Sequence, residues 1–123
     1  DMRAVALLGG CALLMAGCVG MTQTQIRQVQ PELRQTKATA NAVLECVQVS
    51  LNDLPKITTY PSGGRTEISI GLDQLGDYRV YYLIDLRAVE GGTALAVRRA
   101  NSGIRQLSEK ELDALLDRCA PRA

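Results

Sequence analysis

The residues best suited to chemistry in this chain of 123 residues are its four cysteines, Cys11, Cys18, Cys46 and Cys119. A thiolate is a nucleophile, a metal ligand or one half of a disulfide. Histidine is absent, so the His-assisted nucleophiles and the commonest metal ligand are missing. No Cys-x-x-Cys pair is present either, so the thiols supply too few ligands for a zinc site. The sequence predicts that the protein is not an enzyme and has no catalytic residue, metal or cofactor.

Two further signals for chemistry are weak. Asp73 and Asp77 are candidates for an acid and base pair, but nothing near them in the sequence would raise a carboxyl pKa, and we expect solvated loop acids. The glycine pairs at 63–64 and 91–92 are too short for a nucleotide-binding fingerprint and lack the Lys or helix that follows one. We interpret both pairs as hairpin turns.

The overall charge argues against nucleic acid as a partner. The chain has 14 Lys and Arg residues, 13 Asp and Glu residues, and a net charge of +1. A protein this close to neutrality has no overall field that attracts phosphate backbones.

Tyrosine and arginine are the residue types best suited to holding a protein partner, since both are enriched at interaction hot spots. Alternate residues of the strand expected at 77–88 form an amphipathic face, which an arginine of the next strand extends. The predicted partner-binding residues are Arg79, Tyr81, Leu83, Arg87 and Arg98. The alternatives are that these arginines are scattered over the surface, or that a tether or loop covers part of the face.

An uncharged stretch rich in Ala and Leu runs from residue 4 to residue 17, directly after Arg3. It is shorter than the about 20 residues that a membrane-spanning helix needs, and it matches the hydrophobic region of a signal peptide. The alternatives are a secretory leader without lipid and a buried N-terminal helix. The helix is disfavoured because each glycine within it costs about 1 kcal/mol relative to Ala.

The end of this stretch, Leu14-Met15-Ala16-Gly17-Cys18, resembles the lipobox of bacterial lipoproteins. The resemblance implies that residues 1–17 are removed as a signal peptide and that Cys18 carries fatty acyl chains such as palmitate. Met15 departs from the Leu that is more common at its place. Because Val19 rather than Asp follows the cysteine, the resemblance also implies the periplasmic side of the outer membrane.

The remaining thiols predict a disulfide. Cys11 is a weaker lipid acceptor, because too short a hydrophobic run precedes it, and it leaves with the leader. If Cys18 carries the lipid, Cys46 and Cys119 remain, and two thiols in an oxidising periplasm are expected to pair. Their bridge would close a loop of about 70 residues, which the chain-entropy estimate values at roughly 4 kcal/mol. The alternative is a pair of buried thiols that do not react.

The chain is expected to divide into a leader, a tether and one domain. Residues 18–30 are rich in Thr and Gln and should form the lipidated cysteine and a flexible tether. Residues 31–123 should form a single periplasmic domain, because a chain of this length supports one hydrophobic core.

Helices are expected at both ends of this domain. Apolar residues at spacings of three and four predict the first over 31–51, ended by the turn formers Asn52-Asp53. The second begins at Ser108, because Ser108 and Glu111 match a capping box. Each helix carries one of the remaining cysteines. The apolar stripe of the second helix is Leu112, Leu115, Leu116 and Cys119.

Strand-like segments separated by turn signals are expected between the helices, at 56–60, 66–72, 77–88 and 93–100. Alternation predicts that Ile68, Ile70 and Leu72 share one face. The third strand should carry the apolar face Tyr78, Val80, Tyr82, Ile84 and Leu86. We therefore expect an α+β fold, a four-stranded antiparallel meander with both helices on one face and a disulfide between them.

Together these features predict a small, non-enzymatic outer-membrane lipoprotein, anchored in membrane lipid through Cys18, that binds a periplasmic protein or belongs to an envelope complex. The alternative is an immunity or inhibitor lipoprotein that blocks an effector or a lysozyme-like enzyme. A scaffold subunit would copurify with a membrane complex, whereas an inhibitor would bind one enzyme tightly. A hydrolase or ligand carrier is disfavoured, since it would need a deep pocket with convergent polar groups.

Overall fold

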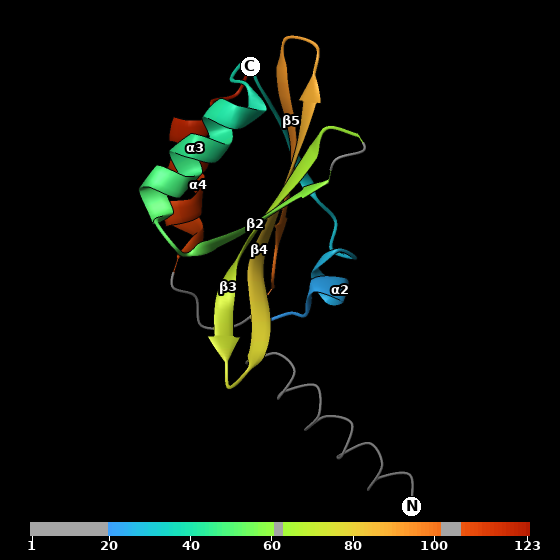
Figure 1. Ribbon diagram of the computed structural model, residues 1–123, viewed down its shortest axis with the longest axis vertical. Coiled ribbons are helices and arrows are strands. Elements are labelled where there is room, and N and C mark those ends of the chain that lie inside the picture. Colours follow the sequence, from blue (N-terminus) through green and yellow to red (C-terminus); the bar gives the residue numbers. More distant parts are fainter. Residues whose placement is uncertain (1–19, 61–62, 102–106) are drawn as a thin grey trace, which may run out of the picture.

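An antiparallel β-sheet with helices on both of its faces forms the framework of the domain (Figure 1). The computed structural model describes residues 20–60, 63–101 and 107–123. Within them the strands lie in the order β1-β5-β4-β3-β2. The elements are α2 (Gln23–Ile26), β1 (Glu32–Thr36), α3 (Ala40–Leu51), β2 (Pro55–Tyr60), β3 (Arg65–Gln74), β4 (Asp77–Val89), β5 (Gly92–Arg99) and α4 (Glu109–Cys119).

The α+β class and the meander of β2 to β5 are confirmed, but the sheet has five strands instead of four. The additional strand β1 lies where the sequence predicts the start of a helix at Pro31. That helix, α3, begins only at Ala40, where the hydroxyl of Thr39 accepts a hydrogen bond from Ala42 N at 3.1 Å. The prediction is therefore wrong for the first nine residues of the segment, 31–39.

Strand β1 could not be recognised because its alternation is inverted. The side chains of Arg34 and Thr36 point into the protein and are 5% and 3% exposed, whereas Leu33 is 73% exposed. Alternation of polar and apolar residues marks a strand only when the apolar residues face the core. In β1 a guanidinium takes the inner position, so the periodicity of the sequence favours the wrong element.

Both α3 and α4 pack on one face of the sheet, as the sequence predicts (Figure 1). The capping box of α4 is confirmed: Ser108 Oγ accepts from Glu111 N, and Glu111 Oε1 accepts from Ser108 N, both at 3.1 Å. Tyr82 of β4 positions the start of this helix, because its hydroxyl donates to Leu107 O at 2.8 Å. The core includes Val43, Val47, Ile68, Ile70, Ile84, Leu86, Leu95, Val97, Leu112, Leu115 and Leu116, each at most 2% exposed.

The predicted disulfide joins Cys46 of α3 to Cys119 of α4, with their Cα atoms 5.4 Å apart. The two helices also meet through Arg118, whose guanidinium donates to Ser50 Oγ at 2.9 Å. Because 73 positions separate the two cysteines, the bridge closes a loop that contains β2 to β5. It therefore fixes both helices to each other over the sheet.

A β-bulge divides β4 into two parts with opposite alternation. Consecutive residues of β3 pair with Val80 and with Tyr82, so Tyr81 is the additional residue on β4. An additional residue moves the side chains on one side of it to the other face. The prediction of one apolar face over 78–86 is therefore wrong at its start. Tyr78 and Val80 belong to a second apolar cluster, and Tyr82 to the core beneath the helices.

Residues 21–29 pack on the second face of the sheet, although the sequence predicts a flexible tether here. Met21 pairs with Val80 through backbone hydrogen bonds of 2.8 and 3.2 Å. Ile26 of α2 is 0% exposed and contacts a cluster that includes Val80 and Leu83. The prediction is wrong for this segment because apolar residues spaced among the Thr and Gln residues supply a buried surface.

Replacing Cys46 with Ser tests the role of the disulfide. The chain-entropy estimate for a loop of this length is about 4 kcal/mol, so we expect C46S to lower the free energy of unfolding in urea by about this amount under oxidising conditions. The wild-type protein with reductant present should unfold at the same urea concentration as C46S. If C46S were instead much less stable than the reduced wild type, lost packing rather than the lost bridge would explain the effect.

Candidate functional site

The second face of the sheet is divided into a covered half and an open half. Near the β3–β4 hairpin, α2 lies over Val80 and Leu83 on the side opposite to α3 and α4 (Figure 1). Arg98 of β5 holds this cover in place, because its Nε donates to Val29 O at 3.0 Å. The covered half is thus part of the fold, and only the other half is available to a partner.

A cluster of charged side chains marks the boundary between the two halves. Glu67 of β3 is 4% exposed; its Oε1 accepts from Arg27 Nη2 at 2.6 Å and from the Tyr60 hydroxyl at 3.2 Å. Arg65 of the same strand lies 3.4 Å from the carboxylate of Glu67 and 3.0 Å from that of Asp85. Its guanidinium also lies 4.5 Å from the ring centre of Tyr60. The boundary is therefore a network in which each charge has an opposite partner.

The pKa of Glu67 is held below its ordinary value. Burial alone would raise this pKa, but hydrogen bonds from Arg27 and Tyr60 and the positive charges of Arg27 and Arg65 outweigh it. A carboxyl with a lowered pKa stabilises the fold above its unfolded pKa, and that contribution is lost as the pH falls through the folded pKa. The ion pair that holds residues 21–29 on the sheet is therefore present at neutral pH and lost in acid.

The open half contains two hollows that share Arg87 of β4. The first, of about 220 Å³, is lined by Leu33, Asp85, Arg87, Ala94, Leu95 and Ala96. The second, of about 470 Å³, is lined by Tyr60, Gly63, Arg65 and Arg87. Arg87 is exposed, and among the described residues it has no acidic partner, whereas Arg65 beside it is paired. On the open half, the guanidinium of Arg87 therefore lies between an apolar hollow and a hollow bordered by Tyr60, and no described carboxylate pairs with it.

Two of the predicted partner-binding residues, Tyr81 and Leu83, lie inside the protein. They are 2% and 1% exposed. Leu83 packs in the cluster around Ile26. Gly20 lies so close to Tyr81 that a Cβ atom at residue 20 would be 2.8 Å from Cε1 of the ring. The prediction of an exposed Tyr81 and Leu83 surface is wrong: Tyr81 belongs to the core cluster that includes residues of α3 and α4, and Leu83 is covered by the N-terminal segment. The alternative of a face partly covered by the tether describes the arrangement at Leu83.

The predicted arginines are separated by the fold. Arg79 pairs with Asp77 at 2.7 Å, and Arg98 holds the chain at Val29. Only Arg87 of the predicted set lies exposed on the open half. The sequence did not indicate the other lining residues. Tyr60 and Arg65 could have been found from their places on either side of the predicted hairpin loop, whereas Leu33 was missed with its strand.

The lipid acceptor predicted at Cys18 lies outside the described residues. Cys46 and Cys119 are joined to each other and supply no reactive thiol. In the described ranges no group of three or more His, Cys, Asp or Glu side chains is placed to hold a metal ion. Among the helices of this described part, none is long and apolar enough to cross a membrane.

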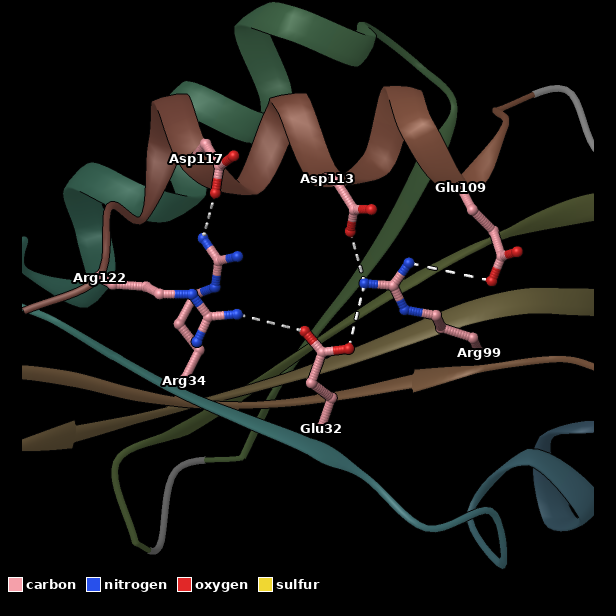
Figure 2. A pocket seen from close by; sticks show the side chains of 7 residues that line it. All are labelled: Glu32, Arg34, Arg99, Glu109, Asp113, Asp117 and Arg122. Carbon is pink, nitrogen blue, oxygen red and sulfur yellow. Dashed lines mark hydrogen bonds and ion pairs between the residues drawn. The ribbon is translucent and has the colours of Figure 1, made fainter.

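A larger groove, of about 610 Å³, lies between α4 and the edge of the sheet (Figure 2). Arg99 occupies its middle, with its guanidinium 2.7 Å from Asp113, 3.3 Å from Glu32 and 3.9 Å from Glu109. The full lining is Glu32, Arg34, Arg99, Glu109, Asp113, Asp117 and Arg122.

The charged side chains of this groove are paired with one another, four carboxylates with three guanidiniums. Arg34 Nη1 donates to Asp117 Oδ1 and to Ala120 O, both at 3.1 Å, and Arg122 lies 3.6 Å from Glu32. The three acids of α4 recur every fourth residue, so one side of the helix is docked on β1 and β5 by ion pairs (Figure 2). A ligand ion would have to displace these contacts. We therefore interpret the groove as the contact between α4 and the sheet, and the open half as the candidate functional site.

Comparison with protein-family models found no matching family. Comparisons with curated proteins and with solved structures also found no match. The function must therefore be argued from the residues of the site.

The ion pair of Glu67 makes a prediction for acid stability. Because the folded pKa is lowered, the wild type should lose stability as the pH falls below about 4.5, the ordinary pKa of a glutamate, and through the lowered folded pKa. E67Q cannot lose this charge, so its melting temperature should depend less on pH over that range. At neutral pH it should be about 2 kcal/mol less stable, the usual value for hydrogen bonds to a charged group.

The matched control is E90Q, which removes an exposed carboxylate of the β4–β5 turn. It should leave the pH dependence of the melting temperature unchanged. Parallel curves for the wild type and E67Q would show that the ion pair contributes nothing to acid sensitivity.

Proposed function

We propose that this protein is a small, non-enzymatic outer-membrane lipoprotein that binds a protein partner on the open half of its sheet. The observation that carries the proposal is Arg87, an exposed guanidinium between two hollows and without an acidic partner among the described residues. The matching partner segment places an acidic side chain on Arg87 and an apolar side chain beside Leu33.

The linings of the hollows support this partner chemistry. Ala94 and Ala96 are small, and Leu33 beside them is 73% exposed, so the first hollow suits an apolar side chain. Hydrogen bonds between a guanidinium and a carboxylate are stronger than those between neutral groups. Tyr60 borders the second hollow, and tyrosine and arginine are the residue types that dominate interaction hot spots.

The partner is expected on the sheet face and not along the outer edge of β1. Addition of a strand needs a row of unpaired backbone groups. Ala123 N already donates to Gln35 O at 2.9 Å, so the C-terminal residue occupies part of this edge. The face beside Arg87 has no such cover from the described residues.

The disulfide supports the compartment that we propose. Disulfides persist in oxidising compartments such as the periplasm and are rare in the cytosol. The Cys46–Cys119 bridge therefore agrees with export of the domain. The lipobox-like sequence that ends at Cys18, followed by Val19, supports a lipid anchor on the periplasmic side of the outer membrane.

A binding role is supported over catalysis because the chain has no histidine and because the charged groove beside α4 consists of mutually paired side chains. The identity of the partner decides between the proposed envelope-complex component and an immunity or inhibitor lipoprotein. Inhibition of a captured enzyme by the purified domain would favour the inhibitor.

Replacing Cys18 with Ala tests the anchor. We expect C18A to lack the acyl groups in the mass spectrum of the envelope protein and to leave the membrane fraction, because several acyl chains together hold a protein stably at about 0.8 kcal/mol per buried methylene. C11A should be acylated and retained like the wild type. An unmodified Cys18 in the wild type, or retention of C18A in the membrane, would contradict the anchor.

A photo-crosslinking residue at Ala96, in the apolar hollow, tests the partner surface in cells. We expect one crosslinked protein, and we expect R87E to reduce its yield about tenfold or more, because the change replaces an attractive charge contact with a repulsive one. The control K110E makes the same change of charge on the exposed side of α4 and should leave the yield unchanged.

A second control places the photo-crosslinking residue at Val49 of α3, which is 74% exposed, much as Leu33 is on the open half. It should not capture the same protein. The same product from Val49, or an equal yield with R87E, would count against the open half as the binding surface.

A further inference from the structure

Charged side chains of alternating sign run across the second face of the sheet, from the N-terminal segment 21–29 to the open half. We call them the charge row, and in order they are Arg27, Glu67, Arg65, Asp85 and Arg87. The first three contacts along the row measure 2.6, 3.4 and 3.0 Å. The last two members are two positions apart on β4, and both line the first hollow. Because three guanidiniums share two carboxylates, one guanidinium remains without an acidic partner of its own.

The arrangement in the structure leaves Arg87 as that guanidinium. Glu67 is buried and is held most closely by Arg27. Arg65 therefore lies nearer to Asp85, at 3.0 Å, than to Glu67, at 3.4 Å. Arg65 Nε and Asp85 Oδ1 are not aligned for a hydrogen bond, so this ion pair lacks the added strength that a hydrogen bond would give it. Arg87 also lies directly opposite Arg65 on the neighbouring strand, where like charges repel each other.

From this arrangement we infer that the docking of residues 21–29 controls whether the open half binds the acidic side chain of its partner. The inference rests on the proposed function of the open half. If Arg27 leaves Glu67, the buried carboxylate loses its closest counter-ion and takes Arg65 as its partner instead. Asp85 is then released from Arg65 and pairs with Arg87. The pairs shift by one position along the charge row, and the guanidinium that recognises the partner is neutralised.

The control acts in both directions, because a coupling between two binding events is reciprocal. A carboxylate of the partner on Arg87 keeps Asp85 with Arg65, and this leaves Glu67 for Arg27. A bound partner therefore stabilises the docked N-terminal segment, just as the docked segment keeps the binding surface positive.

Melting temperatures of the partner-free protein test the shift of pairs. R87Q alone should change the melting temperature little, because Arg87 has no acidic partner among the described residues. In an R27Q background the same change should lower it by a few degrees, because Arg87 then holds Asp85. In a K110Q background, which lacks an exposed lysine of α4 instead, R87Q should again have little effect. An equal effect of R87Q in all three backgrounds would overturn the inference.

Crosslinking from the photo-reactive residue at Ala96 tests the consequence for binding. We expect R27Q to lower the yield of the captured protein about fivefold or more, the usual size of a coupling between two sites. R27K keeps a positive charge beside Glu67 and should retain more of the yield than R27Q does. Adding D85N to R27Q should restore the yield, because no carboxylate is then left to neutralise Arg87.

The restoration by D85N separates the shift of pairs from simple loss of structure. If R27Q failed to bind because the N-terminal segment had detached and the sheet had loosened, D85N would not repair it, and that result would overturn the inference. A protein captured equally well by R27Q and by the wild type would also overturn it, and would leave the proposed function intact. If the wild type captured no protein, the proposed function and its control would fall together.

Discussion

Burial of β4 from both sides is the constraint on which the rest of the structure depends. Its Tyr82, Ile84 and Leu86 face the helices, whereas Val80 and Leu83 face the other way. Leaving a large apolar side chain in water costs about 1.5–3 kcal/mol, and α3 and α4 cover only one face. Residues 21–29 must therefore lie on the second face. Because this segment is short, it covers half of the face, and the other half remains exposed among the described residues.

The arginines fall into two groups: those paired with carboxylates that hold the fold together, and Arg87, which has no acidic partner among the described residues. Arg34 is buried and paired with α4, and Arg27 with Glu67 attaches the N-terminal segment. Removing one partner of a buried pair is costly, because the other charge remains without water or counter-ion. These arginines are needed by the fold. Arg87 has no such role among the described residues, so its charge remains available for recognition.

The sequence predicted those parts of the fold that depend on local signals. The strands β2 to β5 follow from alternation and turns, and α4 follows from Ser108 and Glu111. The disulfide follows from counting thiols once the leader is set apart. β1 was missed because Arg34 is buried and Leu33 is exposed, and the bulge at Tyr81 was missed because one additional residue leaves no local mark. The candidate site was predicted only at Arg87, since its other residues meet through the position of β1 and the cover by α2. Both are tertiary effects that no single segment encodes.

The loop closed by Cys46 and Cys119 also affects how the domain would respond to a pulling force, if the protein is anchored as we propose. Tension between the N-terminus and a partner on the sheet would first load the backbone bridge between Met21 and Val80 and the contacts of α2. While the bridge is intact, a load that enters the loop is shared between the arm that leads to Cys46 and the arm that leads to Cys119. Under tension applied at the N-terminal end, the segment before Cys46 would detach first and lengthen the connection to the point of attachment, while the two bridged helices stayed together. The part of the domain held by the disulfide would then stay folded, while the N-terminal segment became longer.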